Sequence, residues 1–273
     1  MNHTAPTQIQ KLNAVLDGMS RVTVAVSGGV DSLTLAQAAH RRLKGEVEMI
    51  HATSPAVPPE ATARTRDLAK RESWKLQVID AGEFADESYL ANPVNRCFFC
   101  KSALYRSIAG LTERQVVSGA NKDDLGDYRP GMEAAADNGV RHPFVEAGID
   151  KAGVREVARA LGLGEVAELP ASPCLSSRIE TGIPVTPEAL QFVHAVETMV
   201  RDWLAEPGAV RCRVRGAGAA VELDETGLTA VMSEDGKAVR EEVSRLAVAA
   251  GLAGDVPFEP YKMGSAFLKD QIK

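Results

Sequence analysis

The chain has 273 residues and carries 31 Lys and Arg against 37 Asp and Glu, a formal net charge of −6. An acidic balance of this size disfavours broad nucleic-acid binding, which needs a basic surface against the phosphates. The first residues lack a basic segment followed by an apolar stretch, and no apolar run approaches the length of a membrane span. The four cysteines are expected to be reduced thiols, and we expect a cytoplasmic protein that acts on a small molecule.

Stretches rich in Val, Ile and Leu alternate with helical patterns along the first half of the chain. A short leading helix is expected over 10–19. The apolar stretches predict strands at 21–26, 46–51, 75–80 and 115–119. Helical patterns separate these strands at 32–43, 59–72 and 94–109. Strands that alternate with helices predict an α/β fold with a doubly wound parallel sheet, which binds ligands at the carboxyl ends of its strands.

The first of these strands runs directly into a turn of sequence Ser-Gly-Gly-Val-Asp-Ser, and a helical pattern begins at once. Gly28 and Gly29 permit positive φ and a close approach of the backbone, so that several N–H groups converge on phosphate oxygens. Ser27 and Ser32 add hydroxyl donors, and Asp31 is placed to hold a magnesium ion beside the phosphates. The turn therefore predicts an ATP site at the start of a helix. The alternative is an ordinary glycine-rich turn between a strand and a helix.

This turn differs from the common P-loop, whose Gly-x-x-x-x-Gly-Lys-[Ser/Thr] pattern places a lysine on the β- and γ-phosphates. No such lysine follows the turn here. The sequence Ser-Gly-Gly-Val-Asp-Ser instead resembles the pyrophosphate loop, or PP-loop, of the ATP pyrophosphatase superfamily. That resemblance implies cleavage of ATP between the α- and β-phosphates, with adenylation of a substrate oxygen.

The second half of the chain has a different pattern. Asp150 is expected to cap a helix over 151–162, and a Pro-, Ser- and Gly-rich stretch follows. The later patterns predict helices from Thr186 to about 204 and over 234–250, strands at 209–215 and 219–223, and an extended piece at 256–261. We therefore expect two domains, a nucleotide domain over 1–180 and a smaller C-terminal α+β domain over 181–273.

Three cysteines are candidates for chemistry. Cys97 and Cys100 are three residues apart on or at the start of a helix, which places both sulfur atoms on one face. A redox disulfide, a zinc site, an iron–sulfur site and two packed core cysteines are the alternatives. Cys174 follows a proline in a loop, where Arg178 is placed to lower its pKa, so it is a candidate nucleophile or ligand. The alternative for Cys174 is a buried position under the loop.

A fourth cysteine lies in the sequence Val-Arg-Cys-Arg-Val-Arg. The strand period of two sends Arg211, Arg213 and Arg215 to one face and Cys212 to the other, where we expect it in the core. Three guanidinium groups on one face suit a phosphate or a carboxylate, and a solvated strand face is the alternative.

These motifs together resemble one family, the LarE-type sulfur transferases of nickel-pincer nucleotide cofactor synthesis. The resemblance covers nearly the whole chain and rests on residues 27–32, 92–101, 118–131, 170–178, 213–215 and 261–265. Its most specific parts are Asp-Asp-Leu-Gly-Asp-Tyr-Arg-Pro-Gly and Ser-Pro-Cys-Leu-Ser-Ser-Arg. It implies a domain like those of the adenine nucleotide alpha hydrolases, and a reaction. ATP adenylates a carboxylate of pyridinium-3,5-biscarboxylic acid mononucleotide, and sulfur is then delivered to give a thiocarboxylate.

The resemblance also implies roles for particular residues. Asp31 and Asp124 are the expected magnesium ligands, and Gly119 and Asn121 are expected to line the nucleotide site. The expected site for the substrate phosphate consists of Ser177, Arg178, Arg213 and Arg215, with Glu197 and Glu222 ordering the arginines.

The source of the sulfur divides this family. In one branch the loop cysteine gives up its own sulfur in a single turnover, and in the other three cysteines hold a [4Fe-4S] cluster whose remaining iron carries the extra sulfide. Because Cys97, Cys100 and Cys174 are all present, we expect the cluster branch. Three rival functions are weighed against it: a tRNA-thiolating enzyme, an ammonia-dependent synthetase and a non-enzymatic ATP-binding module. We also expect a homo-oligomer.

Overall fold

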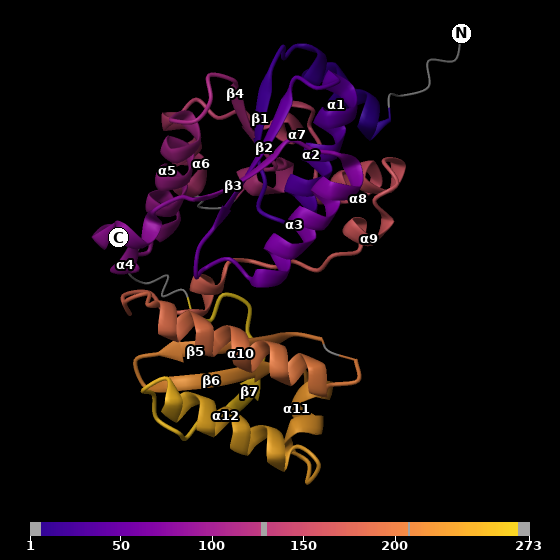
Figure 1. Ribbon diagram of the computed structural model, residues 1–273. Helices are drawn as coiled ribbons and strands as arrows, with labels where there is room; N and C mark the ends of the chain where they lie inside the picture. The colour runs from indigo at the N-terminus through magenta and orange to yellow at the C-terminus, as the bar shows by residue number, and fades with distance from the viewer. Residues whose placement is uncertain (1–6, 127–129, 207, 267–273) are drawn as a thin grey trace. The chain divides into compact units, whose positions relative to one another are not determined.

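The computed structural model describes residues 7–126, 130–206 and 208–266, which fall into two compact units (Figure 1). The first unit consists of the described residues of Met1–Ala85 and Cys97–Ser172, and the second of those of Asp86–Arg96 and Pro173–Lys273. The sequence places a single boundary after residue 180, whereas the contacts also assign Asp86–Arg96 to the second unit. Both predicted domains include an end of the chain that lies outside the described residues. Residues 127–129 of the motif at 118–131 also lie outside them.

The first unit is built on a parallel sheet. Its strands are β1 (Val22–Ala25), β2 (Val47–Thr53), β3 (Leu76–Asp80) and β4 (Gln115–Ser118). They pair in the order β3-β2-β1-β4, so β1 lies between β2 and β4. This arrangement confirms the α/β fold that the alternating pattern predicts, with its parallel sheet flanked by helices.

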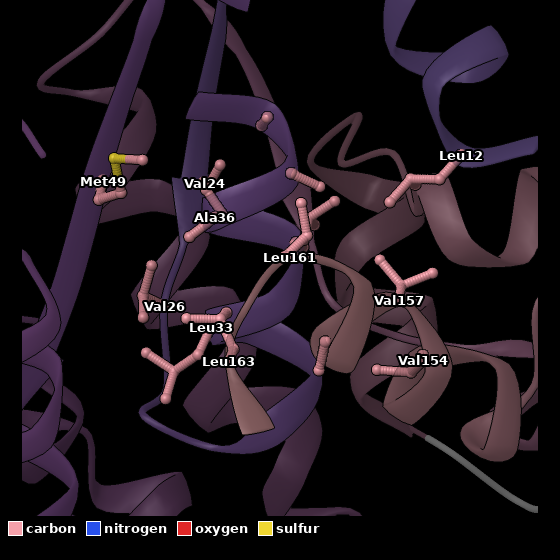
Figure 2. Packing of buried hydrophobic residues seen from close by; sticks show 14 of the residues in the cluster. Leu12, Val24, Val26, Leu33, Ala36, Met49, Val154, Val157, Leu161 and Leu163 are labelled. Carbon is pink, nitrogen blue, oxygen red and sulfur yellow. The ribbon is translucent and has the colours of Figure 1, made fainter. Parts of the chain in front are cut away.

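Both faces of this sheet are covered, because successive strand residues point to opposite sides. Val24 and Met49 belong to one apolar cluster, whereas their neighbours Ala25 and Ile50 belong to another. The larger cluster also contains residues of α1 (Gln8–Asp17), α2 (Val30–Leu43), α3 (Pro59–Glu72), α8 (Lys151–Ala160) and α9 (Gly164–Ala167). Figure 2 shows its side chains packed between β1, α2 and α8. The smaller cluster contains residues of α5 (Arg96–Ala109) and α6 (Pro130–Asp137).

The second unit has a separate mixed sheet. Strand β5 (Val210–Arg215) pairs antiparallel with β6 (Gly218–Leu223), and β6 pairs parallel with β7 (Phe258–Pro260). Its long helices are α10 (Pro187–Trp203), α11 (Glu225–Met232) and α12 (Lys237–Ala249). Helix α10 packs against β5 and α12, and α11 packs against β6 and β7. This is the smaller α+β unit that the sequence predicts.

The remaining elements are short. They are η1 (Glu83–Ala85), α4 (Glu87–Leu90), η2 (Lys122–Leu125), α7 (Pro143–Glu146) and η3 (Leu175–Arg178). Within the described ranges no helix is both long and apolar enough to cross a membrane.

Buried hydrogen bonds explain why the segment before Cys97 belongs to the second unit. The Tyr89 hydroxyl lies 2.7 Å from Ser176 Oγ, and Arg96 Nη1 donates to the Ser176 carbonyl oxygen at 2.9 Å. Asn92 Nδ2 donates to two carbonyl oxygens of the turn at 180–183, at 2.8 and 2.9 Å. Local sequence patterns do not report such pairings, because the partners are 80 to 91 residues apart along the chain.

Candidate functional site

The turn after β1 is fixed by its own side chains. Gly28 has a φ of +80°, and a Cβ atom there would lie 2.6 Å from the Ala61 carbonyl oxygen, so both conformation and space require glycine. Ser32 Oγ accepts a hydrogen bond from the Ser27 amide at 3.0 Å and donates to the Gly29 carbonyl oxygen at 3.1 Å. The turn therefore presents a defined backbone at the start of α2.

A second loop, which follows β4, packs directly on this helix start. A Cβ atom at Gly119 would lie 2.7 Å from the Ser32 amide nitrogen and 2.8 Å from the Asp31 carbonyl carbon, so only glycine fits without a backbone shift. Asn121 Nδ2 donates to Asp31 Oδ1 at 3.2 Å, and the Asn121 amide donates to Asp124 Oδ2 at 3.0 Å. Because β1 and β4 are adjacent parallel strands, their following loops meet at one edge of the sheet. The structure thus brings together the residues that the sequence assigns to a nucleotide site.

The acidic residues beside the turn have the chemistry of a magnesium site. Asp31 and Asp124 present carboxylate oxygens, the donors that Mg²⁺ prefers, and the Asp31 side chain is 25% exposed. Asn121 contacts both carboxylates through its side-chain and backbone N–H groups. The donor set therefore fits a magnesium ion at the edge of the turn.

Lys151 also contacts this site, and the sequence reasoning missed it. Its Nζ atom forms an ion pair with Asp31 Oδ2, and its amide donates to Asp123 Oδ2 at 3.1 Å. The sequence identifies Asp150 as the cap of the helix but gives the following lysine no role. Only the cap signal indicated that Lys151 is the first residue of α8.

Two further residues that the sequence reasoning missed support the turn from β2 and α3. His51 lies with Nδ1 2.8 Å from the Val26 carbonyl oxygen and Nε2 2.8 Å from Thr62 Oγ1. Burial lowers the pKa of the His51 imidazole below its ordinary value, which favours the neutral ring. Arg64 Nη1 donates to the Gly28 carbonyl oxygen at 2.7 Å. These contacts hold the backbone on either side of the glycine turn.

The second unit contains a buried ion pair that joins η3 to α10. Arg178 Nε and Nη2 donate to the two carboxylate oxygens of Glu197 at 2.9 and 3.0 Å. Glu197 also accepts from Arg201 Nη2 at 2.6 Å and from the Cys212 amide at 3.0 Å. Burial alone would raise the pKa of the Glu197 carboxyl, but the hydrogen bonds and charges of the two arginines outweigh it and hold that pKa below its ordinary value.

A second pair lies on β5 and β6. Arg213 Nε donates to Glu222 Oε2 at 3.0 Å, and Arg213 Nη1 donates to the Ser177 carbonyl oxygen at 3.1 Å. Arg215 donates to Glu222 and, at 2.9 Å, to Glu259 Oε2. All six residues expected at a phosphate site therefore lie in the second unit, where the two expected glutamates bind the guanidinium groups.

The burial of residues on β5 tests the two interpretations of its arginine face, a phosphate or carboxylate site and a solvated strand face. Cys212 is fully buried, which confirms the core position that the sequence favours for it, and burial raises its thiol pKa well above the ordinary value. Burial, followed by the charge of Arg178, lowers the pKa of Arg211. Because Arg213 is buried too, this face of β5 is not the solvated strand face weighed as the alternative.

The three candidate cysteines are divided between the units. Cys97 and Cys100 lie in the first turns of α5 in the first unit, and Cys174 is the exposed N-cap residue of η3 in the second unit. None of the cysteines is in a disulfide bond, as expected for reduced thiols. Among the residues that the structure describes, no three His, Cys, Asp or Glu side chains are grouped so as to hold a metal ion.

Comparisons with known proteins place the chain in a family. No protein-family model matches it. The chain is 31% identical, over 81% of its length and 81% of the relative, to pyridinium-3,5-bisthiocarboxylic acid mononucleotide synthase of Lactiplantibacillus plantarum. It is also 37% identical to an uncharacterized protein of Synechocystis, over 71% of this chain and 74% of that one. An uncharacterized protein of Methanocaldococcus jannaschii is 25% identical over 81% of this chain and 84% of its own. At this identity and coverage, the chain belongs to the LarE-type family, that of pyridinium-3,5-bisthiocarboxylic acid mononucleotide synthase.

Proposed function

We propose that this protein is an ATP-dependent sulfur transferase. It adenylates a carboxylate of pyridinium-3,5-biscarboxylic acid mononucleotide and converts that carboxylate to a thiocarboxylate. The observation that carries the proposal is the 31% identity to a synthase whose name states a bisthiocarboxylic acid mononucleotide as its product. Gly28 in the glycine turn and Gly119 in the loop after β4, neither of which a larger residue can replace without a backbone shift, support the use of ATP.

The first step is adenylation. A carboxylate oxygen of the substrate attacks the α-phosphorus of ATP, the bond to the β-phosphate bridging oxygen breaks, and pyrophosphate leaves. Backbone N–H groups and hydroxyls preorganised around the departing charge stabilise such a step. In this proposal Asp31 and Asp124 hold magnesium, which neutralises phosphate charge. The residues that bind ATP and pyrophosphate are Ser27, Gly28, Gly29, Ser32, Gly119 and Asn121.

The second step is sulfur transfer. Sulfide attacks the activated carbonyl carbon, the bond to the phosphate oxygen breaks, and AMP leaves with the electron pair. We assign Cys97, Cys100 and Cys174 as ligands of a [4Fe-4S] cluster, which supplies the sulfide when bound. None of these three cysteines is in a disulfide bond.

The substrate's phosphate is assigned to the arginine cluster of the second unit. Planar guanidinium groups bind phosphate through paired hydrogen bonds, and rigid ones lose less entropy when they do so. Glu197 and Glu222 supply that rigidity, since each binds two arginines. The phosphate ligands are then Ser177, Arg178, Arg213 and Arg215.

Anaerobic purification followed by a pyrophosphate-release assay tests the proposal. The wild type should release pyrophosphate from ATP only when the biscarboxylic mononucleotide is present, and Asp31→Asn should abolish that release. Iron and acid-labile sulfide should be present in the wild type and lost in Cys97→Ala. Pyrophosphate release that is equal with and without the mononucleotide would contradict the adenylation step.

The single-turnover alternative, in which Cys174 gives up its own sulfur, predicts a different result for the same anaerobically purified protein. An iron-free protein whose mass falls by one hydrogen sulfide after turnover would assign the sulfur to Cys174 and overturn the cluster. The family and the adenylation step would stand. A cytoplasmic location and a homo-oligomeric state stay predictions of the sequence.

A further inference from the structure

We propose that Arg201 and Arg211 are further ligands of the substrate's phosphate, at the end of the arginine cluster where Glu197 lies. This inference rests on the proposed function, because it adds residues to the phosphate site of the second unit. The phosphate ligands assigned above include neither of them. The contacts along β5 and the charges around Glu197 carry the inference.

Two guanidinium groups meet at the free edge of β5. The strand order β5-β6-β7 leaves one side of β5 without a strand partner, so side chains bind its outward N–H and C=O groups. Arg211 Nη1 and Arg201 Nη2 both donate to the Val210 carbonyl oxygen, at 2.8 and 3.2 Å. Along the same strand, the Cys212 amide donates to Glu197 Oε1. Two guanidinium groups and one carboxylate therefore lie together at this edge.

Positive charge exceeds negative charge around Glu197. This carboxylate binds Arg178 and Arg201, and within the part of the chain that the structure describes Arg211 has no carboxylate partner. A guanidinium group stays protonated in proteins, so three positive charges face one negative charge. Burial and then the charge of Arg178 lower the pKa of the Arg211 guanidinium, as expected for a cation that lacks an anion.

The other end of the arginine cluster is balanced. Arg213 and Arg215 both bind Glu222, and Arg215 also binds Glu259, so two guanidinium groups face two carboxylates. A phosphate monoester carries a charge of about −1.5 to −2 at pH 7, which matches the excess of two around Glu197. A single carboxylate would neutralise only half of that excess. The charges therefore favour a phosphate at the Glu197 end.

Arg201 and Arg211 also have N–H groups to offer a ligand. The Arg178 side chain is only 4% exposed, and its Nε, Nη1 and Nη2 atoms all donate to the protein. Arg201 is 34% exposed, and its contacts with the described residues involve Nη2 alone, whereas those of Arg211 involve Nη1 alone. The remaining nitrogen atoms of these two groups suit the paired hydrogen bonds through which guanidinium binds phosphate.

Calorimetry with nicotinic acid mononucleotide, a pyridinium carboxylate that carries the same kind of phosphate, tests the assignment. Arg211→Met keeps an unbranched apolar side chain but removes the charge, so affinity should fall about tenfold or more, and Arg201→Met should have a similar effect. Arg211→Lys should restore part of the affinity, since it keeps the charge but not the paired donors. Arg245→Met removes an arginine of α12 that is 67% exposed, and this matched control should bind as the wild type does.

Two further measurements separate a phosphate ligand from a structural residue. Nicotinic acid riboside, which lacks the phosphate, should bind equally to the wild type and to Arg211→Met. Without ligand, Arg211→Met should have an unchanged or higher urea midpoint, because it removes an uncompensated charge.

Equal mononucleotide affinity in the wild type and in Arg211→Met and Arg201→Met would overturn this inference and leave the proposed function standing. An equal loss of affinity for the mononucleotide and for the riboside would also overturn it, since the phosphate would then have no part in the effect. A wild type that neither binds the mononucleotide nor releases pyrophosphate with the biscarboxylic substrate would overturn the proposed function and this inference together.

Discussion

The Glu197 carboxylate offers the sharpest test of the second unit. It is 1% exposed and accepts four hydrogen bonds, from Arg178 twice, from Arg201 and from the Cys212 amide. Glu197→Gln keeps the size of the side chain but removes its charge, and turns an NH₂ group toward guanidinium donors. Removing one partner of a buried ion pair costs about 3–5 kcal/mol, because the remaining charge is left uncompensated. We expect the free energy of unfolding of this unit to fall by that amount.

Urea denaturation followed by tryptophan fluorescence measures this loss. The chain has two tryptophans, Trp74 in the first unit and Trp203 at the end of α10, so a Trp74→Phe background reports the second unit alone. Glu188→Gln, in the exposed first turn of α10, is the matched control and should cost only a few tenths of a kcal/mol. A loss below about 1 kcal/mol in Glu197→Gln would refute the buried pair, since exposed ion pairs are worth that little.

Three further predictions concern Glu197, the close approach of Gly119 to the glycine turn, and the hydrogen bonds of Asn92. The pKa of Glu197 is lowered in the folded state, so this carboxylate stabilises the protein above the ordinary pKa of a glutamate and loses that effect as the pH falls below that ordinary pKa. The difference in free energy of unfolding between the wild type and Glu197→Gln, measured by urea denaturation, should therefore narrow from about pH 7 to about pH 3. Gly119→Ala places a methyl group 2.7 Å from the Ser32 amide nitrogen, so ATP affinity by calorimetry should fall about tenfold or more, and an unchanged affinity would contradict the close approach of the two loops. Asn92→Ala removes the donor to two partly buried carbonyl oxygens and a buried partner of Arg96, and should destabilise the second unit by about 2–4 kcal/mol in the fluorescence assay. A cost equal to that of Asn95→Ala would argue against the network.

Most of the first unit's sheet and its glycine turn were predictable from the sequence. Stretches rich in Val, Ile and Leu alternate with helical patterns, and β1, α2, α3 and β4 begin or end within a few residues of the predicted bounds. The turn was predictable for a local reason, since two adjacent glycines between a strand and a helix have few other uses. Short elements such as α7, four residues long, were missed because they span too few residues for a period to appear.

The strand period predicted only that the arginines of β5 share a face, and the resemblance to a family added Arg178, Glu197 and Glu222 to this group. The structure decided the pairings. Glu197 binds Arg201 as well as the expected Arg178, because both guanidinium groups reach the same buried carboxylate from η3 and from one turn along α10.

By itself, then, the sequence determined what depends on neighbours along the chain: the alternation of elements, the glycine turn after β1 and the cap at Asp150. Only the tertiary structure decided that Asp86–Arg96 packs with the second unit and that Lys151 contacts Asp31. These contacts join residues some 80 to 120 positions apart, and they form because packing brings distant loops to one sheet edge or one buried turn. Local propensity does not predict such long-range contacts, so the sequence alone shows Lys151 only as the first residue of a helix and not as a residue beside the glycine turn.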